Sequence, residues 1–125
     1  MNISEIKSRI KDKDLSNKTY ALLKGRIIRL IDLEYQPGWC EVIFEDTNEN
    51  TISVIDKIPV IYVDFDYDYE KLDLQIKKSP LEIYIPCVVL KQENNIVEID
   101  ISYVLGLEDS NKESIFSVSE KSLIQ

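Results

Sequence analysis

The sequence predicts a mostly β protein: an antiparallel six- to seven-stranded barrel or curved sheet, preceded by a short N-terminal α-helix. Apolar and polar residues alternate with a period of two over several short segments, which is the period of an extended strand. Turn-like stretches join these segments, so we expect hairpins instead of the strand–helix alternation of a parallel sheet. A chain of 125 residues fits one domain. We therefore predict a single domain over 1–125, with a helix at 3–13 and a β core at 20–118.

The first segment has helical spacing. Ile3, Ile6 and Ile10 recur every three or four residues, with basic residues between them. Asn2 followed by Glu5 is typical of a capping box at a helix start. This pattern predicts a short amphipathic helix over 3–13.

The first half of the β core contains three predicted strands. Residues 20–33 are rich in β-branched and apolar side chains, and Gly25 marks a place where a long strand could bulge or bend. A turn is predicted at 36–38, and the strand Trp39–Glu45 follows, with Cys40, Val42 and Phe44 on one face. Residues 46–50 form a hairpin-type loop before a strand at 51–55.

Residues 61–70 alternate almost without a break, which predicts another strand. One face would carry Ile61, Val63, Phe65, Tyr67 and Tyr69, and the other Tyr62, Asp64, Asp66, Asp68 and Glu70. The pattern either continues through Leu72, Leu74 and Ile76 or gives way to a loop.

The last third of the chain predicts further hairpin strands. Residues 81–90 are the most apolar strand, in which Pro86 indicates a bulge or a sheet edge. A turn at 91–95 leads to a strand at 96–103, with Tyr103 facing inward. A polar segment runs from Gly106 to Glu113, and a short strand follows at 115–118. Residues 119–124 are expected to be a final helical turn or a frayed tail.

The cysteines and the apolar runs bear on location. Cys40 and Cys87 each lie in an apolar, strand-like run, and their separation fits neither a zinc motif nor a disulfide framework. We expect two reduced, buried thiols and a cytoplasmic protein. The longest apolar runs are far shorter than a membrane span, and the N-terminus has no continuous apolar stretch of the secretory type. No membrane association is expected.

The composition argues against catalysis. The chain contains no histidine, which removes the usual general base and the commonest ligand of transition metals. Its three glycines do not cluster, so no phosphate-binding loop or dinucleotide fingerprint is present. Asp64, Asp66 and Asp68 have the spacing of a calcium loop, but Tyr69 stands where such a loop requires glycine. We predict no enzyme activity, no cofactor and no metal site.

Charge is distributed unevenly along the chain. The net charge is -8, yet residues 32–73 alone hold twelve acidic and two basic residues, a balance of -10. A patch of that sign repels phosphate backbones and attracts cationic surfaces. The predicted partner-binding residues are the acids and one tyrosine of the strand face, with three acids from the preceding hairpin: Tyr62, Asp64, Asp66, Asp68 and Glu70, helped by Glu41, Glu45 and Asp46.

Three stretches together resemble a family. They are residues 55–60 (Ile-Asp-Lys-Ile-Pro-Val), residues 85–90 (Ile-Pro-Cys-Val-Val-Leu), and residues 106–110 (Gly-Leu-Glu-Asp-Ser) leading to Phe116-Ser117-Val118. Their order and spacing resemble small bacterial immunity proteins of polymorphic and contact-dependent growth-inhibition toxins. The resemblance implies stoichiometric neutralisation of a cognate toxin domain in the cytoplasm, often a nuclease with a basic active-site cleft. It transfers no catalytic residues.

Two other interpretations stay open. The chain could be another acidic interaction module, such as a phage-encoded inhibitor or an assembly subunit. It could also be a nucleic-acid-binding barrel of the oligonucleotide-binding type, which needs a basic groove with stacking aromatic residues. The -10 window disfavours direct binding of nucleic acid.

Overall fold

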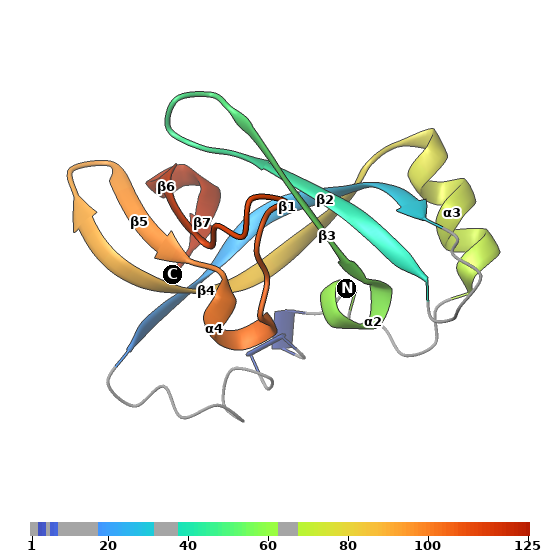
Figure 1. Ribbon diagram of the computed structural model, residues 1–125, viewed down its shortest axis with the longest axis horizontal. Helices are drawn as coiled ribbons and strands as arrows, with labels where there is room; N and C mark the ends of the chain where they lie inside the picture. Colours follow the sequence, from blue (N-terminus) through green and yellow to red (C-terminus); the bar gives the residue numbers. More distant parts are fainter. Residues whose placement is uncertain (1–2, 5, 8–17, 32–37, 63–67) are drawn as a thin grey trace.

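The protein is an antiparallel seven-stranded sheet curled into a half-barrel (Figure 1). The computed structural model describes residues 3–4, 6–7, 18–31, 38–62 and 68–125. The strand order is β3-β2-β1-β4-β5-β6, and β7 pairs with β1. The elements are β1 (Thr19–Ile31), β2 (Trp39–Glu45), β3 (Thr51–Lys57), α2 (Ile58–Ile61), α3 (Tyr69–Lys78), β4 (Leu81–Glu93), β5 (Ile96–Asp100), α4 (Ser102–Leu105), β6 (Ile115–Ser119), the 3-10 turn η1 (Glu120–Ser122) and β7 (Leu123–Ile124). The mostly β prediction is confirmed.

The two longest strands, β1 and β4, form the centre of the sheet. They pair from Thr19 opposite Val89 to Ile27 opposite Leu81. β1 then continues beside β2, and its register shifts between Ile27 and Arg29. The irregularity therefore lies slightly beyond Gly25, where the sequence suggested it. At Gly25 itself, an added Cβ would lie only 3.2 Å from the carbonyl oxygen of Ile43.

The β2–β3 hairpin is built as the sequence predicts. The strands pair from Trp39 opposite Lys57 to Glu45 opposite Thr51. Asp46 closes the turn, because its carboxylate accepts hydrogen bonds from the backbone N–H groups of Asn48 and Asn50. Such local side-chain bonds are the reason Asp favours turns.

Pro86 lies in the first part of β4, which pairs, among the described strands, with β1 alone. The pairing of β4 with β5 begins only at Val88. A residue without an N–H group is tolerated where one side of the strand has no neighbour. The predicted edge position of Pro86 is therefore correct locally, although β4 as a whole lies inside the sheet.

The core fills the concave side of the half-barrel. Cys40, Val42 and Phe44 are buried on one face of β2, as their alternation predicts. Cys40 and Cys87 are both free and fully buried. A second, smaller cluster joins Ile6 to Leu22 on β1 and Val104 on α4.

The predicted N-terminal helix over 3–13 is not confirmed. Residues 3–4 and 6–7 have helical backbone, while 5 and 8–13 lie outside the described residues, and the first strand starts at Thr19. Ile6 is nevertheless buried against the sheet, as the apolar face of such a helix requires.

The predicted strand over 61–70 is wrong at both described ends. Ile61 closes α2, and α3 begins at Tyr69. Asp68 is the N-cap of α3, because its carboxylate accepts bonds from the N–H groups of Glu70 and Lys71. Residues 63–67, with Asp64 and Asp66, lie outside the described residues.

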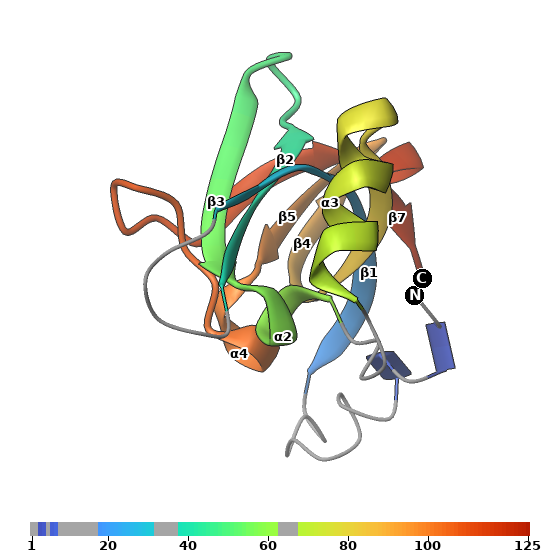
Figure 2. The ribbon, with the colours of Figure 1, turned by 90° about the vertical axis from the view of Figure 1, so that its right-hand side faces the viewer.

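The stretch after Asp68 is likewise neither strand nor loop. Leu72 and Ile76 stand one helical turn apart, and both are buried on the face of α3 that packs against β1 (Figure 2). Leu74 points away and is 60% exposed. Tertiary burial of this helical face overrides the local alternation.

The strand predicted over 96–103 ends early, at Asp100. The carboxylate of Asp100 accepts hydrogen bonds from the backbone N–H and the hydroxyl of Ser102, which turns the chain into α4. Gly106 ends α4 in the left-handed conformation, at φ 69°. Tyr103 consequently sits on α4 and is 42% exposed, so its predicted inward orientation is wrong.

Candidate protein-binding site

The two ends of the sheet differ in how they are covered. On the β6 side, the backbone N–H of Thr47 in the β2–β3 turn donates to the carbonyl oxygen of Ser117 over 2.9 Å. The rings of Phe44 and Phe116 meet edge to face beneath it, with centroids 5.4 Å apart. We call this contact the seam. Among the strands that the structure describes, β3, at the other end of the sheet order, has a neighbour only on the β2 side.

The hydrogen-bonding direction of β3 follows from the bonds that flank it. The backbone N–H of Asp46 donates to the carbonyl of Asn50, and the backbone N–H of Ile58 donates to the carbonyl of Gly38. In an antiparallel pair, hydrogen-bonded and non-hydrogen-bonded residue pairs alternate, so the even-numbered residues of β3 form the hydrogen-bonded pairs with β2. Residues 52, 54 and 56 therefore point their backbone groups at β2. Residues 51, 53, 55 and 57 point theirs away from the sheet.

Part of this outer edge is already occupied. The N–H of Lys57 donates to the Asp56 carboxylate at 2.7 Å. For Ser53 and Ile55, no hydrogen bond to these outward groups is found within the described part of the chain. The side chain of Ile55 is 45% exposed. The open stretch of the edge therefore centres on Ser53 and Ile55.

A shallow groove runs beside this open stretch. It has a volume of about 130 Å³ and is lined by Ser53, Ile55, Glu108, Asp109 and Ser110. The last three belong to the loop between α4 and β6, which lies beside β3 in Figure 2. We call it the β3 groove. One wall is thus a strand edge and the other an acidic loop.

Negative charge dominates the loop wall. Residues 106–114 contain Glu108, Asp109 and Glu113 against Lys112. Glu108 and Glu113 are exposed, and neither side chain has a hydrogen bond or ion pair within the described residues. Asp109 is partly exposed, and its carboxylate holds the loop by accepting from the N–H groups of Asn111 and Glu113.

The sequence-predicted acids that the structure describes lie on two separate elements, β2 with its turn and the start of α3. On the outer face of β2, Glu41 pairs with Arg29 and accepts from the Ser53 hydroxyl, while Glu45 pairs with Arg26. The Ser53 bond and then the Arg29 bond hold the pKa of Glu41 below its usual value. Both glutamates are thus largely compensated by arginines of the same chain.

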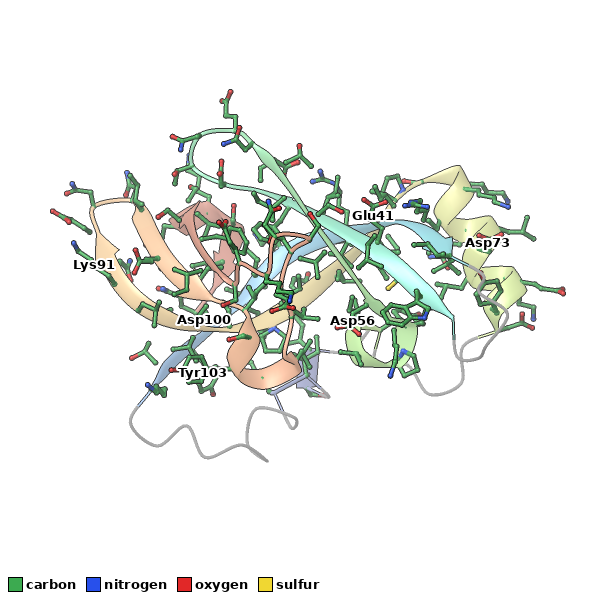
Figure 3. The ribbon with its side chains drawn as sticks, in the orientation of Figure 1. Glu41, Asp56, Asp73, Lys91, Asp100 and Tyr103 are labelled. Atoms are coloured by element: carbon green, nitrogen blue, oxygen red, sulfur yellow. The ribbon has the colours of Figure 1, made fainter. Side chains whose placement is uncertain are left out.

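The other predicted residues within the described part of the chain serve local structure. Burial acts to raise the pKa of Asp46, but the hydrogen bonds from Asn50 and Asn48 outweigh it, so the pKa is lowered and the carboxylate stays ionised in its turn. Asp68 caps α3, Glu70 lies in its first turn, and Tyr62 follows α2 and packs on the core. Figure 3 shows Glu41 on β2 and Asp73 on α3, far from Lys91 at the opposite end of the molecule.

These residues therefore do not form one strip within the described structure, and the groups at the β3 groove were not predicted as a site. The sequence marks 106–113 only as a polar segment. Nothing in its pattern places that segment beside β3, because the two are far apart in the chain.

Other kinds of site are not seen in the described residues. No group of three or more potential metal-ligating side chains occurs among them. None of the helices they form has the length and apolar character needed to cross a bilayer. Comparisons with protein-family models, curated proteins and solved structures give no match.

Proposed function

We propose that this chain is a non-catalytic binding protein that takes a cationic protein partner at the β3 groove, and that it neutralises a bacterial toxin domain in the cytoplasm. The observation that carries the proposal is the pairing of an open strand edge with uncompensated acids across a groove. Backbone groups at an edge supply affinity, and charge supplies association rate and selectivity.

The chemistry of nuclease toxins fits such a surface. A nuclease must hold an anionic substrate, so its active cleft is cationic. An acidic inhibitor gains association rate by electrostatic steering towards that cleft. The sequence resemblance to immunity proteins points to the same role.

The nucleic-acid alternative finds less support. It requires a basic surface, whereas two arginines of β1, Arg26 and Arg29, are engaged by glutamates on β2 and the 32–73 window carries a charge of -10. A phage-encoded inhibitor or an assembly subunit would use the same acidic groove, and only the identity of the partner separates those roles from immunity.

The test is co-expression with the product of the neighbouring gene, which the proposal requires to be a toxin domain. We expect the chain to restore growth and to form a one-to-one complex that weakens at high salt. Reversal of charge in Glu108→Lys with Glu113→Lys should weaken the complex about tenfold or more. The matched control, Glu93→Lys with Glu120→Lys, makes the same net charge change on exposed residues elsewhere.

The outcomes test separately the immunity role, the β3 groove and the acids around α3. Failure to protect and failure to bind would reject the immunity role. Equal weakening by both double variants would show that net charge, and not the β3 groove, drives association. If Glu70→Lys abolishes binding and the Glu108→Lys, Glu113→Lys double variant does not, the acids around α3 form the recognition surface.

A further inference from the structure

We infer that the β3 groove binds its partner by strand addition: an extended, Lys- or Arg-bearing segment of the partner pairs with β3 along Thr51–Ile55. This inference rests on the proposed function and specifies how the partner is held. It follows from the direction of the backbone groups on β3, from the groove beside them and from the charge of the facing loop.

The outer edge of β3 has unused hydrogen-bonding capacity within the described part of the chain. Ser53 and Ile55 each point an N–H and a C=O group away from the sheet, as the alternation of the β2–β3 pairs dictates. Two such residues offer four main-chain bonds in the geometry of an antiparallel or parallel neighbour. An added strand would lie about 4.8 Å from β3, which is the ordinary spacing in a sheet.

The Thr51–Ile55 part of the edge contains no proline and no charged side chain. Proteins commonly blunt edge strands with prolines, bulges, charged side chains or a covering loop. The charged residues of β3 stand at its end, where Asp56 occupies the N–H of Lys57, and the α4–β6 loop lies across the groove from Ser53 and Ile55. The Thr51–Ile55 stretch has no register shift against β2, and Ile55 is exposed.

The charge of the facing loop selects a basic occupant for the groove. Glu108 and Asp109 line the far side of the groove, so the added strand would place its side chains within reach of carboxylates. Basic side chains at alternate positions would be compensated there. A second copy of this chain would instead bring two acidic loops together, which disfavours self-pairing.

The probe is a library of random dodecapeptides displayed on phage and selected against the whole protein. We expect enriched peptides to carry Lys or Arg in an alternating, β-prone sequence. In amide-exchange measurements the N–H groups of Ser53 and Ile55 should exchange faster in the free protein than those of Ile52 and Val54. They should become protected at least tenfold when a selected peptide binds.

Two substitutions of Ile55 distinguish the contribution of its backbone N–H to peptide binding from that of its side chain. Ile55→Pro removes the outward N–H without touching a bond to β2, since that group faces away from the sheet. Ile55→Thr keeps the N–H and changes only the side chain. We expect Ile55→Pro to weaken peptide binding at least tenfold and Ile55→Thr to change it less than threefold, with both variants retaining the far-UV spectrum of the parent.

The results discriminate between outcomes. Equal effects of the two substitutions, or no protection at Ser53 and Ile55, would overturn strand addition. A concentration-dependent dimer that Ile55→Pro abolishes would overturn it in favour of self-pairing. If the toxin domain is neutralised normally by Ile55→Pro, strand addition fails while the proposed function stands. If peptides bind the edge but the toxin domain is not bound, the proposed function fails and the edge remains a peptide site.

Discussion

The aromatic contact at the seam lends itself to a quantitative test. Phe44 is 1% exposed and Phe116 is 8% exposed, and their rings meet at an interplanar angle of 80°. An edge-to-face pair of this kind contributes about 0.5–1.5 kcal/mol beyond the burial of its surface. We expect Phe44→Leu and Phe116→Leu each to lower the free energy of unfolding by about 1–3 kcal/mol.

A double-mutant cycle isolates the ring–ring term. The double variant should lose about 1 kcal/mol less than the sum of the two single losses, since the second substitution has no ring left to contact. Urea unfolding followed by the fluorescence of Trp39, the only tryptophan, supplies all four free energies.

The control pairs Phe116→Leu with Ile76→Val. Ile76 lies on the buried face of α3, and α3 is at the opposite end of the molecule from β6 (Figure 1). The two losses should add to within about 0.5 kcal/mol, because the sites share no contact. Additivity in the Phe44–Phe116 cycle as well would refute the view that the ring contact helps to hold the seam.

Three further predictions concern the N-cap of α3, the stability of the protein at acid pH and the reactivity of its two thiols. Asp68→Ala should destabilise the protein by about 1 kcal/mol through loss of the α3 N-cap, and Asp68→Asn by much less, as measured by urea midpoints. The lowered pKa of Glu41 contributes stability that is present above its ordinary value of 4.5 and is lost as the pH falls through the folded value. Glu41→Gln should reduce the loss of stability at acid pH, and an unchanged loss would contradict the role of the Ser53 and Arg29 contacts in lowering the Glu41 pKa. Burial raises the pKa of Cys40 and of Cys87 to about 12, so iodoacetamide at pH 8 should label both only in urea. Rapid labelling of the native protein would disprove their burial.

Local alternation predicts the β2–β3 hairpin correctly, and the reason is visible in its residues. Cys40, Val42 and Phe44 recur at a period of two, and Asp46 stabilises the turn with its own carboxylate. These interactions involve residues near one another in the chain, so the sequence pattern suffices to predict them.

The same reasoning fails over 61–70, because a period of two does not exclude a helix boundary inside the run. Asp68 can equally face solvent on a strand or cap a helix, and the burial of Leu72 and Ile76 against β1 selects the second. A cap signal followed by apolar residues four apart was present in the sequence, but its energetic weight depends on the surface it packs against.

The amino-acid sequence by itself determined the β class, the buried thiols, the hairpin at 46–50 and the excess of acidic groups. Only the tertiary structure decided which acids are compensated and which remain free. Arg26 and Arg29 reach the glutamates of β2 through strand pairing, while Glu108 comes to lie beside the open edge of β3. These contacts join segments that are far apart in the chain. The position of each charged side chain on the surface is therefore decided only when the sheet folds around its core.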